Sequence, residues 1–247
     1  MHGGAVRAGS SLAARGIEPL SALKAERNVA EKRAIARAAV ELVDDGMTVA
    51  VGAGTTTLEI ARLLRGRRIA VITNSISIFH VLTDPTDDPG SGGAVHLTGG
   101  QRTPSDALVG PVANVMLERV RCDLGFLGTH GIDLTVGFTS PNIAEAETNR
   151  RLIASSRSTA MVADHTKVGE IGAHLFAEFS DPGTSTVVAQ RQGQAATDNQ
   201  AQFRVRSTAR FHSPYRRARS ASAMVGSQRS SSDQLARISS SVHTPAA

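Results

Sequence analysis

The sequence has 247 residues, of which 40% are hydrophobic, with one cysteine, one tyrosine and no tryptophan. A chain of this length can form one or two domains with a sizeable core. A single cysteine excludes an internal disulfide framework, and the scarcity of tyrosine and tryptophan disfavours an aromatic platform for nucleic-acid bases. No apolar run reaches the roughly 18 residues of a membrane span. The N-terminus lacks the apolar core of a signal peptide, so we expect a cytoplasmic protein.

The positive charge of the chain lies near its C-terminus. The net charge is +5, but residues 183–247 hold nine arginines, no lysine and two aspartates, a balance of +7, which leaves 5 − 7 = −2 for the rest. The rest of the chain therefore lacks the bulk basic surface typical of DNA-binding domains. After residue 181 periodicity is lost, so we predict a disordered basic tail over 182–247. The tail either binds nucleic acid or is sequence that was not selected for folding.

The first predicted elements are a linker and an amphipathic helix. Residues 1–24 are rich in glycine, alanine and serine, and we expect a leader and linker there. Within 25–43, apolar residues recur at helical spacing and predict a helix that packs on a sheet and is ended by Asp45 and Gly46. We therefore place the start of the folded domain at residue 25 and its end at residue 181.

The next stretch, residues 47–64, organises the rest of the domain. Its apolar residues 49–51 predict a strand, Gly52-Ala53-Gly54 a tight turn, and 55–64 a helix that begins with three threonines. Glycine permits close backbone approach, and a helix N-terminus presents unpaired N–H groups and a positive dipole, so this turn suits a phosphate. The spacing matches neither the dinucleotide nor the Walker fingerprint, and a plain connection without a ligand is the alternative.

Strands and helices then alternate along the chain. We predict strands over 68–73, 94–98, 123–128 and 158–163, and helices over 76–82, 111–120 and 139–156, the last with a hydroxyl cap at Thr139 and Ser140 and Pro141 in its first position. Cys122 is expected to be a small buried residue at a strand start. This alternation predicts an α/β fold with a mostly parallel sheet flanked by helices.

Polar turns follow five of the predicted strands, at 52–57, 74–75, 99–100, 128–130 and 164–167. In a parallel α/β sheet, ligands gather at the carboxyl ends of the strands. We therefore predict that these five turns converge on one ligand site. The alternative is that some of them only connect a strand to the next element.

Six motifs between residues 2 and 181 resemble the C-terminal sensor domain of the DeoR family of bacterial transcriptional repressors. In chain order they are V-G-A-G-T-T-T-L-E at 51–59, I-T-N-S at 72–75, L-T-G-G at 97–100, L-V-G-P at 108–111, F-L-G-T-H-G-I-D at 126–133 and A-D-H-T-K-V-G at 163–169. Each motif alone is weak, and their order and spacing together carry the resemblance.

The resemblance implies a Rossmann-like domain related to ribose-5-phosphate isomerase and glucosamine-6-phosphate deaminase. It implies an effector-binding part of a regulator of carbohydrate metabolism that senses a phosphorylated sugar and forms a homo-oligomer, and we expect no cofactor and no metal. The effector site that it implies comprises Gly54, Thr55, Thr56, Thr57, Asn74, Ser75, Gly99, Gly100, Gly128, His130 and Lys167. Lys167 matches a phosphate-side lysine, and an exposed loop lysine is the alternative.

Histidines and glutamates near this site leave alternatives open. His130 stands where the commoner motif has an aspartate, and the related isomerases use carboxylates to take a proton from carbon. We therefore expect no catalytic residue, with a sugar-phosphate isomerase or deaminase as the alternative function. His130 either hydrogen-bonds a hydroxyl, acts as a base or merely packs, and His165 has the same alternatives. Glu145 and Glu147 most simply stabilise a helix N-terminus, with ligand contact as the alternative.

The chain departs from the family pattern at both ends. Family members carry a winged helix-turn-helix before this domain, whereas residues 2–5 resemble only the end of its wing, so we expect that the chain alone does not bind operator DNA. The basic tail stands where family members continue with a strand and a helix, which predicts an open sheet edge. A nonfunctional gene fragment is therefore a further alternative.

Overall fold

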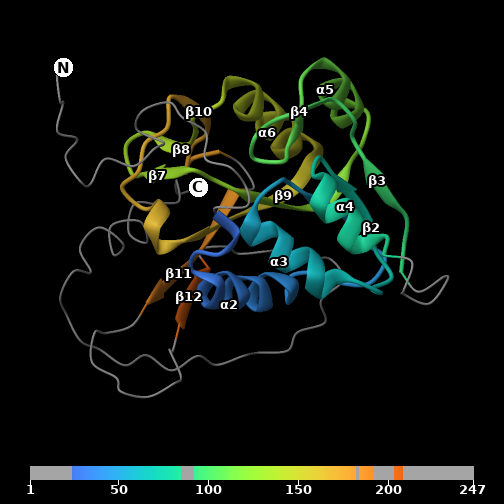
Figure 1. Cartoon of the computed structure of the whole chain (residues 1–247), viewed down its shortest axis with the longest axis horizontal. Coiled ribbons are helices and arrows are strands. Elements are labelled where there is room, and N and C mark those ends of the chain that lie inside the picture. Colours follow the sequence, from blue (N-terminus) through green and yellow to red (C-terminus); the bar gives the residue numbers. More distant parts are fainter. Residues whose placement is uncertain (1–23, 85–91, 182–183, 192–202, 208–247) are drawn as a thin grey trace, which may run out of the picture.

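A seven-stranded sheet forms the centre of the domain (Figure 1). The computed structural model describes residues 24–84, 92–181, 184–191 and 203–207. Within these residues the strands of the sheet are β1 (Thr48–Val51), β2 (Ala70–Thr73), β3 (Val95–Leu97), β6 (Cys122–Gly128), β9 (Ser156–Asp164), β11 (Thr184–Arg191) and β12 (Phe203–Ser207). Their order is β12-β11-β9-β6-β1-β2-β3, and only β12 runs antiparallel to its neighbour. The expected mostly parallel sheet is confirmed.

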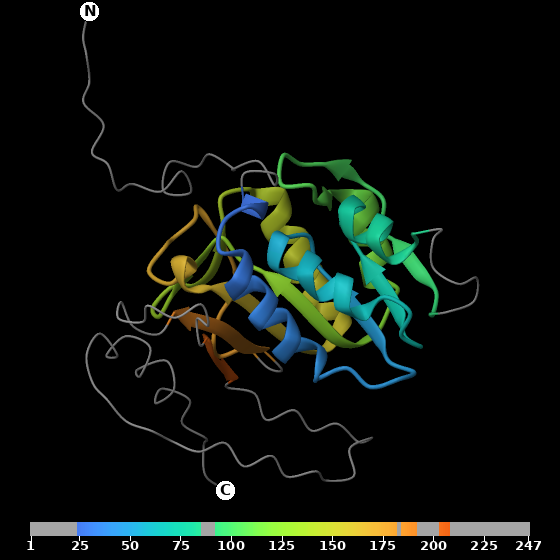
Figure 2. The ribbon, with the colours of Figure 1, turned by 60° about the horizontal axis from the view of Figure 1, so that its bottom comes forward.

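Helices cover both faces of the sheet, as Figures 1 and 2 show. They are α2 (Val29–Val40), α3 (Thr55–Leu64), α4 (Ile76–Leu82), α5 (Pro111–Glu118) and α6 (Ile143–Ser155). Val51 and Phe126 pack with α2, α3 and α4, whereas Ala50 and Leu127 pack with α5 and α6. Because successive strand residues point to opposite faces, each strand serves two cores. No helix of the described residues is both long and apolar enough to cross a membrane.

Two small sheets, which the sequence did not predict, lie beside the main one. One has the order β10-β8-β7 and is built from β7 (Gly131–Asp133), β8 (Gly137–Ser140) and β10 (His174–Ala177). The other is a hairpin of β4 (Gln101–Arg102) and β5 (Leu108–Val109). These strands have two to four residues each, too few for an alternating pattern to stand out in the sequence.

The predicted start of helix α6 is wrong. Thr139 and Ser140 lie in β8 and pair with β10, so they do not cap the helix, and Pro141 does not occupy its first position. The cap is Asn142, whose Oδ1 accepts hydrogen bonds from the backbone N–H groups of Ala144 at 2.9 Å and of the third helical residue at 3.2 Å. Asparagine is a strong N-cap, and the strand pairing satisfies the backbone before it. The first predicted helix, 25–43, is shorter at Val29–Val40.

The prediction of disorder from residue 182 is wrong for two segments. β11 pairs in parallel with β9 over six residues, and β12 pairs with β11, so β9 does not form an open edge. Four of the five residues in T-S-T-V-V at 184–188 are β-branched and favour a strand. Pairing with β9 satisfies the backbone groups of this segment, which sequence composition alone does not reveal. The leader at 1–23 and the rest of the tail lie outside the described residues.

Cys122 is buried at the first position of β6, as expected. Burial, reinforced by the charge of Asp123, raises the pKa of its thiol to about 11.

We therefore expect the native protein to resist thiol reagents at pH 8 and to react fully once unfolded, because only the thiolate attacks. An unfolded thiol ionises near pH 8.5, so the stability that Cys122 contributes falls between that pH and about 11. Labelling with a chromogenic disulfide, with and without denaturant, is the measurement. Rapid labelling of the native protein would contradict this placement.

Candidate functional site

A cavity of about 620 Å³ opens at the carboxyl ends of three central strands. Its lining includes residues 53–56 after β1, residues 128–130 after β6, and residues 162–164 at the end of β9 with Thr166 and Lys167 beyond them. The lining also includes residues of the segment 24–32, which leads into and begins α2. The cavity therefore lies where parallel α/β sheets bind their ligands.

The N-terminus of α3 contributes to this cavity through Gly54, Thr55 and Thr56. Gly54 is the N-cap and supplies no side-chain hydrogen bond to the helix. Without such a cap, the first N–H groups of a helix and its positive dipole end are suited to a bound anion. The Thr56 side chain is mostly buried, so its hydroxyl is held in a defined place at the wall.

All three lysines of the sequence, Lys24, Lys32 and Lys167, line this one cavity. The chain has 27 − 3 = 24 arginines, so lysine is rare in it and concentrated at this place. Lys32 is only 4% exposed and donates a hydrogen bond to the Lys24 carbonyl oxygen. Burial lowers the pKa of Lys32, while the carboxylate of Asp164 opposes that shift. The compact ammonium groups give the cavity a cationic wall.

Carboxylates and histidines surround the lysines. The Lys24 Nζ lies 3.3 Å from Nε2 of His130, and the Nδ2 of Asn28 donates to Asp164 at 3.2 Å. Asn28 adopts a left-handed backbone conformation with φ 53°, which asparagine tolerates better than most residues. These contacts join the segment 24–32 to the turns that follow β6 and β9.

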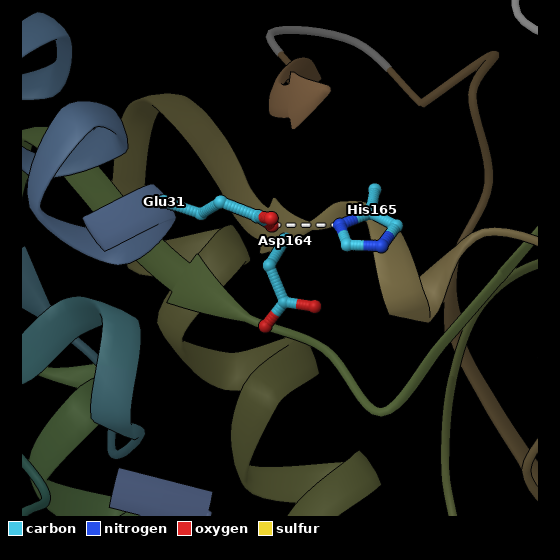
Figure 3. A group of neighbouring side chains, drawn as sticks. All are labelled: Glu31, Asp164 and His165. Carbon is cyan, nitrogen blue, oxygen red and sulfur yellow. Dashed lines mark hydrogen bonds and ion pairs between the residues drawn. The ribbon is translucent and has the colours of Figure 1, made fainter. Parts of the chain in front are cut away.

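Glu31, Asp164 and His165 bring potential metal-ligating atoms within 4.8 Å of one another (Figure 3). His165 Nδ1 lies 2.7 Å from Glu31 Oε2, and Asp164 accepts from Asn28 and from the backbone N–H and hydroxyl of Thr166. Such a set of oxygen and nitrogen ligands would suit a divalent cation. The same atoms already form a hydrogen bond between Glu31 and His165 and a turn at Asp164, which account for the arrangement by themselves.

The structure divides the predicted effector residues into two groups. Six of them line the cavity: Gly54, Thr55, Thr56, Gly128, His130 and Lys167. Five do not: Thr57, Asn74, Ser75, Gly99 and Gly100. The threonine turn and Lys167 therefore face the same cavity, and full convergence of the five polar turns is wrong.

The five residues outside the lining have structural contacts instead. Thr57 donates to Gly54 O at 2.9 Å, and Asn74 accepts from the N–H of residue 53 and donates to Leu108 O. Ser75 caps α4 through a bond from the N–H of residue 78 at 3.3 Å. Gly99 and Gly100 have φ of 71° and 118° at the entry to β4. A Cβ at residue 100 would lie 2.5 Å from the residue 109 carbonyl, so this glycine is required by close packing.

Several lining residues were missed by the sequence reasoning. Lys24, Arg27 and Lys32 line the cavity but precede the first strand, in a segment interpreted only as a linker and an amphipathic helix. The rarity of lysine in an arginine-rich chain was the available signal. Ser105 was missed because it lies in a polar loop, and for Glu145 ligand contact was only the alternative to a helix-stabilising role.

Fold and site together define an α/β ligand-binding domain with a lysine-lined cavity at the carboxyl edge of its sheet. Residues 27–187 match the family model described as the DeoR C-terminal sensor domain. The chain belongs to this family, and it carries the effector-binding sensor domain of a DeoR-type transcriptional regulator. The match extends past residue 181 into β11, which agrees with the corrected end of the folded domain.

Three curated relatives illustrate the family. The HTH-type transcriptional regulator GlpR of Haloferax volcanii is 37% identical over 182 residues, which are 73% of this chain and 68% of the relative. The putative aga operon transcriptional repressor of Escherichia coli O157:H7 is 34% identical over 64% of this chain and 58% of the relative. The lactose phosphotransferase system repressor of Staphylococcus aureus is 32% identical over 73% of this chain and 70% of the relative. The relatives are transcriptional regulators, which favours the sensor interpretation over an isomerase or deaminase.

Among solved structures, ribose 5-phosphate isomerase A from Methanocaldococcus jannaschii is 17% identical over 57% of this chain and 55% of that chain, with a TM-score of 0.41.

Proposed function

We propose that the cavity binds a phosphorylated sugar and that its occupancy controls a transcriptional regulator. One observation carries this proposal: all three lysines of the sequence line the same cavity as the N-terminus of α3. Helix N-termini and lysine ammonium groups both stabilise phosphate dianions. The name of one relative, a lactose phosphotransferase system repressor, is consistent with a carbohydrate effector.

The remaining attributes of the regulator belong to the same proposal. We infer that the effector is bound without turnover, that DNA is the partner of the whole regulator and that it acts in the cytoplasm. Homo-oligomer formation stays a prediction. Apolar surface for it is available on α5 and at the start of α6, where Val112, Val115 and Ile143 are exposed.

Calorimetric titration tests the effector claim. Glucose 6-phosphate, fructose 6-phosphate and ribose 5-phosphate are each compared with the unphosphorylated sugar. We expect at least one ester to bind and the free sugars not to bind. Lys167→Ala is expected to weaken binding of that phosphorylated sugar roughly tenfold. A hydrogen bond from a partly exposed cation contributes about 1.5 kcal/mol, and about 1.4 kcal/mol corresponds to a tenfold change in affinity.

Lys167→Arg is the matched variant for charge, and it should retain part of the affinity. Equal binding of phosphorylated and free sugars, or of native and Lys167→Ala protein, would remove phosphate recognition from the proposal. Turnover of a bound ester, followed by product chromatography, would instead favour an enzyme.

A further inference from the structure

Glu145 is a buried carboxylate in the wall of the cavity. It lies in the first turn of α6, is 5% exposed and lines the cavity together with Ser105. A carboxylate removed from water is unfavourable unless hydrogen bonds satisfy it. Hydrogen-bond donors around the Glu145 carboxylate must therefore offset the cost of burying it.

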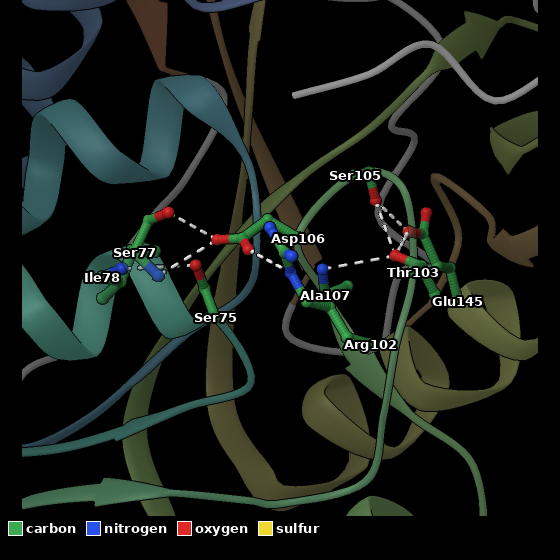
Figure 4. A network of polar contacts seen from close by, with 9 residues as sticks. All are labelled: Ser75, Ser77, Ile78, Arg102, Thr103, Ser105, Asp106, Ala107 and Glu145. Carbon is green, nitrogen blue, oxygen red and sulfur yellow. Dashed lines mark hydrogen bonds and ion pairs between the residues drawn. The ribbon is translucent and has the colours of Figure 1, made fainter. Parts of the chain in front are cut away.

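Three hydroxyl groups hold this carboxylate. Thr103 Oγ1 donates to Oε1 at 2.7 Å and Ser105 Oγ donates to the same oxygen (Figure 4). Ser140 Oγ lies 3.4 Å from Oε2. Each carboxylate oxygen has two lone pairs and can accept more than one donor. Hydroxyl groups, the groups that a sugar carries, are thus among the partners of the Glu145 carboxylate.

The loop that supplies two of these hydroxyls is itself fixed from the other side. Asp106 has φ 71° and accepts from Ser77 N at 3.0 Å, from Ser77 Oγ at 2.5 Å and from Arg102 Nε at 2.9 Å. Burial opposes ionisation of Asp106, but the bonds from Ser77 and Arg102 outweigh it and lower its pKa. Figure 4 shows Asp106 between Ser77 and the Glu145 cluster. The carboxylate of Glu145 is therefore held in place before a ligand arrives.

Glu145 reaches the cavity from a different element than Lys167. Glu145 lies in the first turn of α6 and is bonded to the loop that holds Thr103 and Ser105, whereas Lys167 follows β9. Both side chains line the same cavity. The lining therefore offers a lysine for a phosphate and, from another element, a carboxylate for hydroxyl groups.

We propose that Glu145 accepts hydrogen bonds from hydroxyl groups of the ligand and so selects polyhydroxylated phosphate monoesters. This inference rests on the proposed phosphate-binding function and names the ligand class of the same cavity. A hydroxyl donor bound to a carboxylate makes a strong, charge-assisted hydrogen bond. The same negative charge repels a second phosphate placed beside it, so sugar bisphosphates are disfavoured.

The test compares Glu145→Gln with Glu147→Gln, which lies on the same helix outside the cavity lining and pairs with Arg150 and Arg151. The probes are inorganic phosphate, glucose 6-phosphate, fructose 6-phosphate, ribose 5-phosphate and fructose 1,6-bisphosphate. For the tightest-binding monoester, Glu145→Gln should weaken binding about tenfold or more. Binding of inorganic phosphate should stay unchanged or tighten, and the bisphosphate should bind better. Glu147→Gln should change none of these.

A comparison of two ligands on the native protein tests the inference without any substitution. Hexyl phosphate has six carbons and a phosphate but no hydroxyl groups, and it should bind at least tenfold more weakly than the best hexose monophosphate. Equal binding of the two, or equal loss of inorganic phosphate and monoester in Glu145→Gln, would overturn the role of Glu145 alone. Failure of the native protein to bind any phosphorylated probe would overturn the proposed function and this inference with it.

Discussion

Replacing Lys32 by methionine is expected to weaken binding of a sugar phosphate about 100-fold while leaving the domain folded. Lys32 is 4% exposed, so its interaction with a bound phosphate is screened by water much less than that of a surface lysine. Methionine keeps the length of the side chain and removes the cost of burying a charge. Asp164 and Glu31 keep their bonds to Asn28, Thr166 and His165, so the loss in free energy of unfolding should stay below the roughly 3–5 kcal/mol typical of breaking a buried ion pair.

The pH dependence gives this prediction a second readout. Burial lowers the pKa of Lys32 in the folded protein. As pH rises through that lowered pKa, the ammonium loses its proton and phosphate binding should weaken. The contribution of Lys32 to the free energy of unfolding should rise over the interval from that pKa to the ordinary lysine value, because the unfolded chain binds the proton more tightly there. Both trends should diminish in Lys32→Met.

Arg33→Met is the matched control for the change at Lys32. The side chain of Arg33 is 60% exposed and lies 3.5 Å from Glu59 on the outside of α2. A surface pair of this kind contributes roughly 0–1 kcal/mol, so neither binding nor folding should change much. Calorimetry and urea denaturation of both variants are the measurements. If Lys32→Met bound as tightly as native protein, the buried end of the cationic wall would not contact the phosphate.

The central turn of the site was predictable because its signal is local. A short apolar run at 49–51, a glycine turn and apolar residues at helical spacing follow one another within the eighteen residues 47–64. The rule that ligands bind at the carboxyl ends of parallel strands then places Thr55 and Lys167 at one edge. That edge contains the cavity, although the two residues are more than one hundred positions apart in the chain.

The other walls of the site were not predictable from local pattern. Lys24 and Lys32 reach the cavity only because α2 packs across β9 and β11, a tertiary arrangement that helical spacing does not encode. Ser105 depends on a hairpin of two-residue strands and on the left-handed backbone of Asp106. Asn74 and Ser75 follow a strand in the same way as Thr55 does, yet their side chains satisfy neighbouring backbone groups. Position after a strand therefore predicts the edge but not the direction of a side chain.

Replacing Phe126 by alanine is expected to lower the free energy of unfolding by about 3–5 kcal/mol, through lost apolar burial and the cavity left behind. Phe126 is fully buried in β6, between β1 and β9, and packs in the core that α2 and α3 cover. Domains are typically stable by only about 5–15 kcal/mol, so this variant should lie close to unfolding at 25 °C. The loss should also loosen the edge at which β1, β6 and β9 hold the cavity.

Leu63→Ala separates burial at Phe126 from a general effect of shortening an apolar side chain. Leu63 is 45% exposed on α3, and alanine has the higher helix propensity, so its loss should cost less than about 1 kcal/mol. Urea denaturation monitored by circular dichroism measures both variants. Similar small losses at Phe126 and Leu63 would mean that β6 does not occupy the centre of the sheet. The cavity would then lose its support, because residues 128–130 enter its wall directly from the end of that strand.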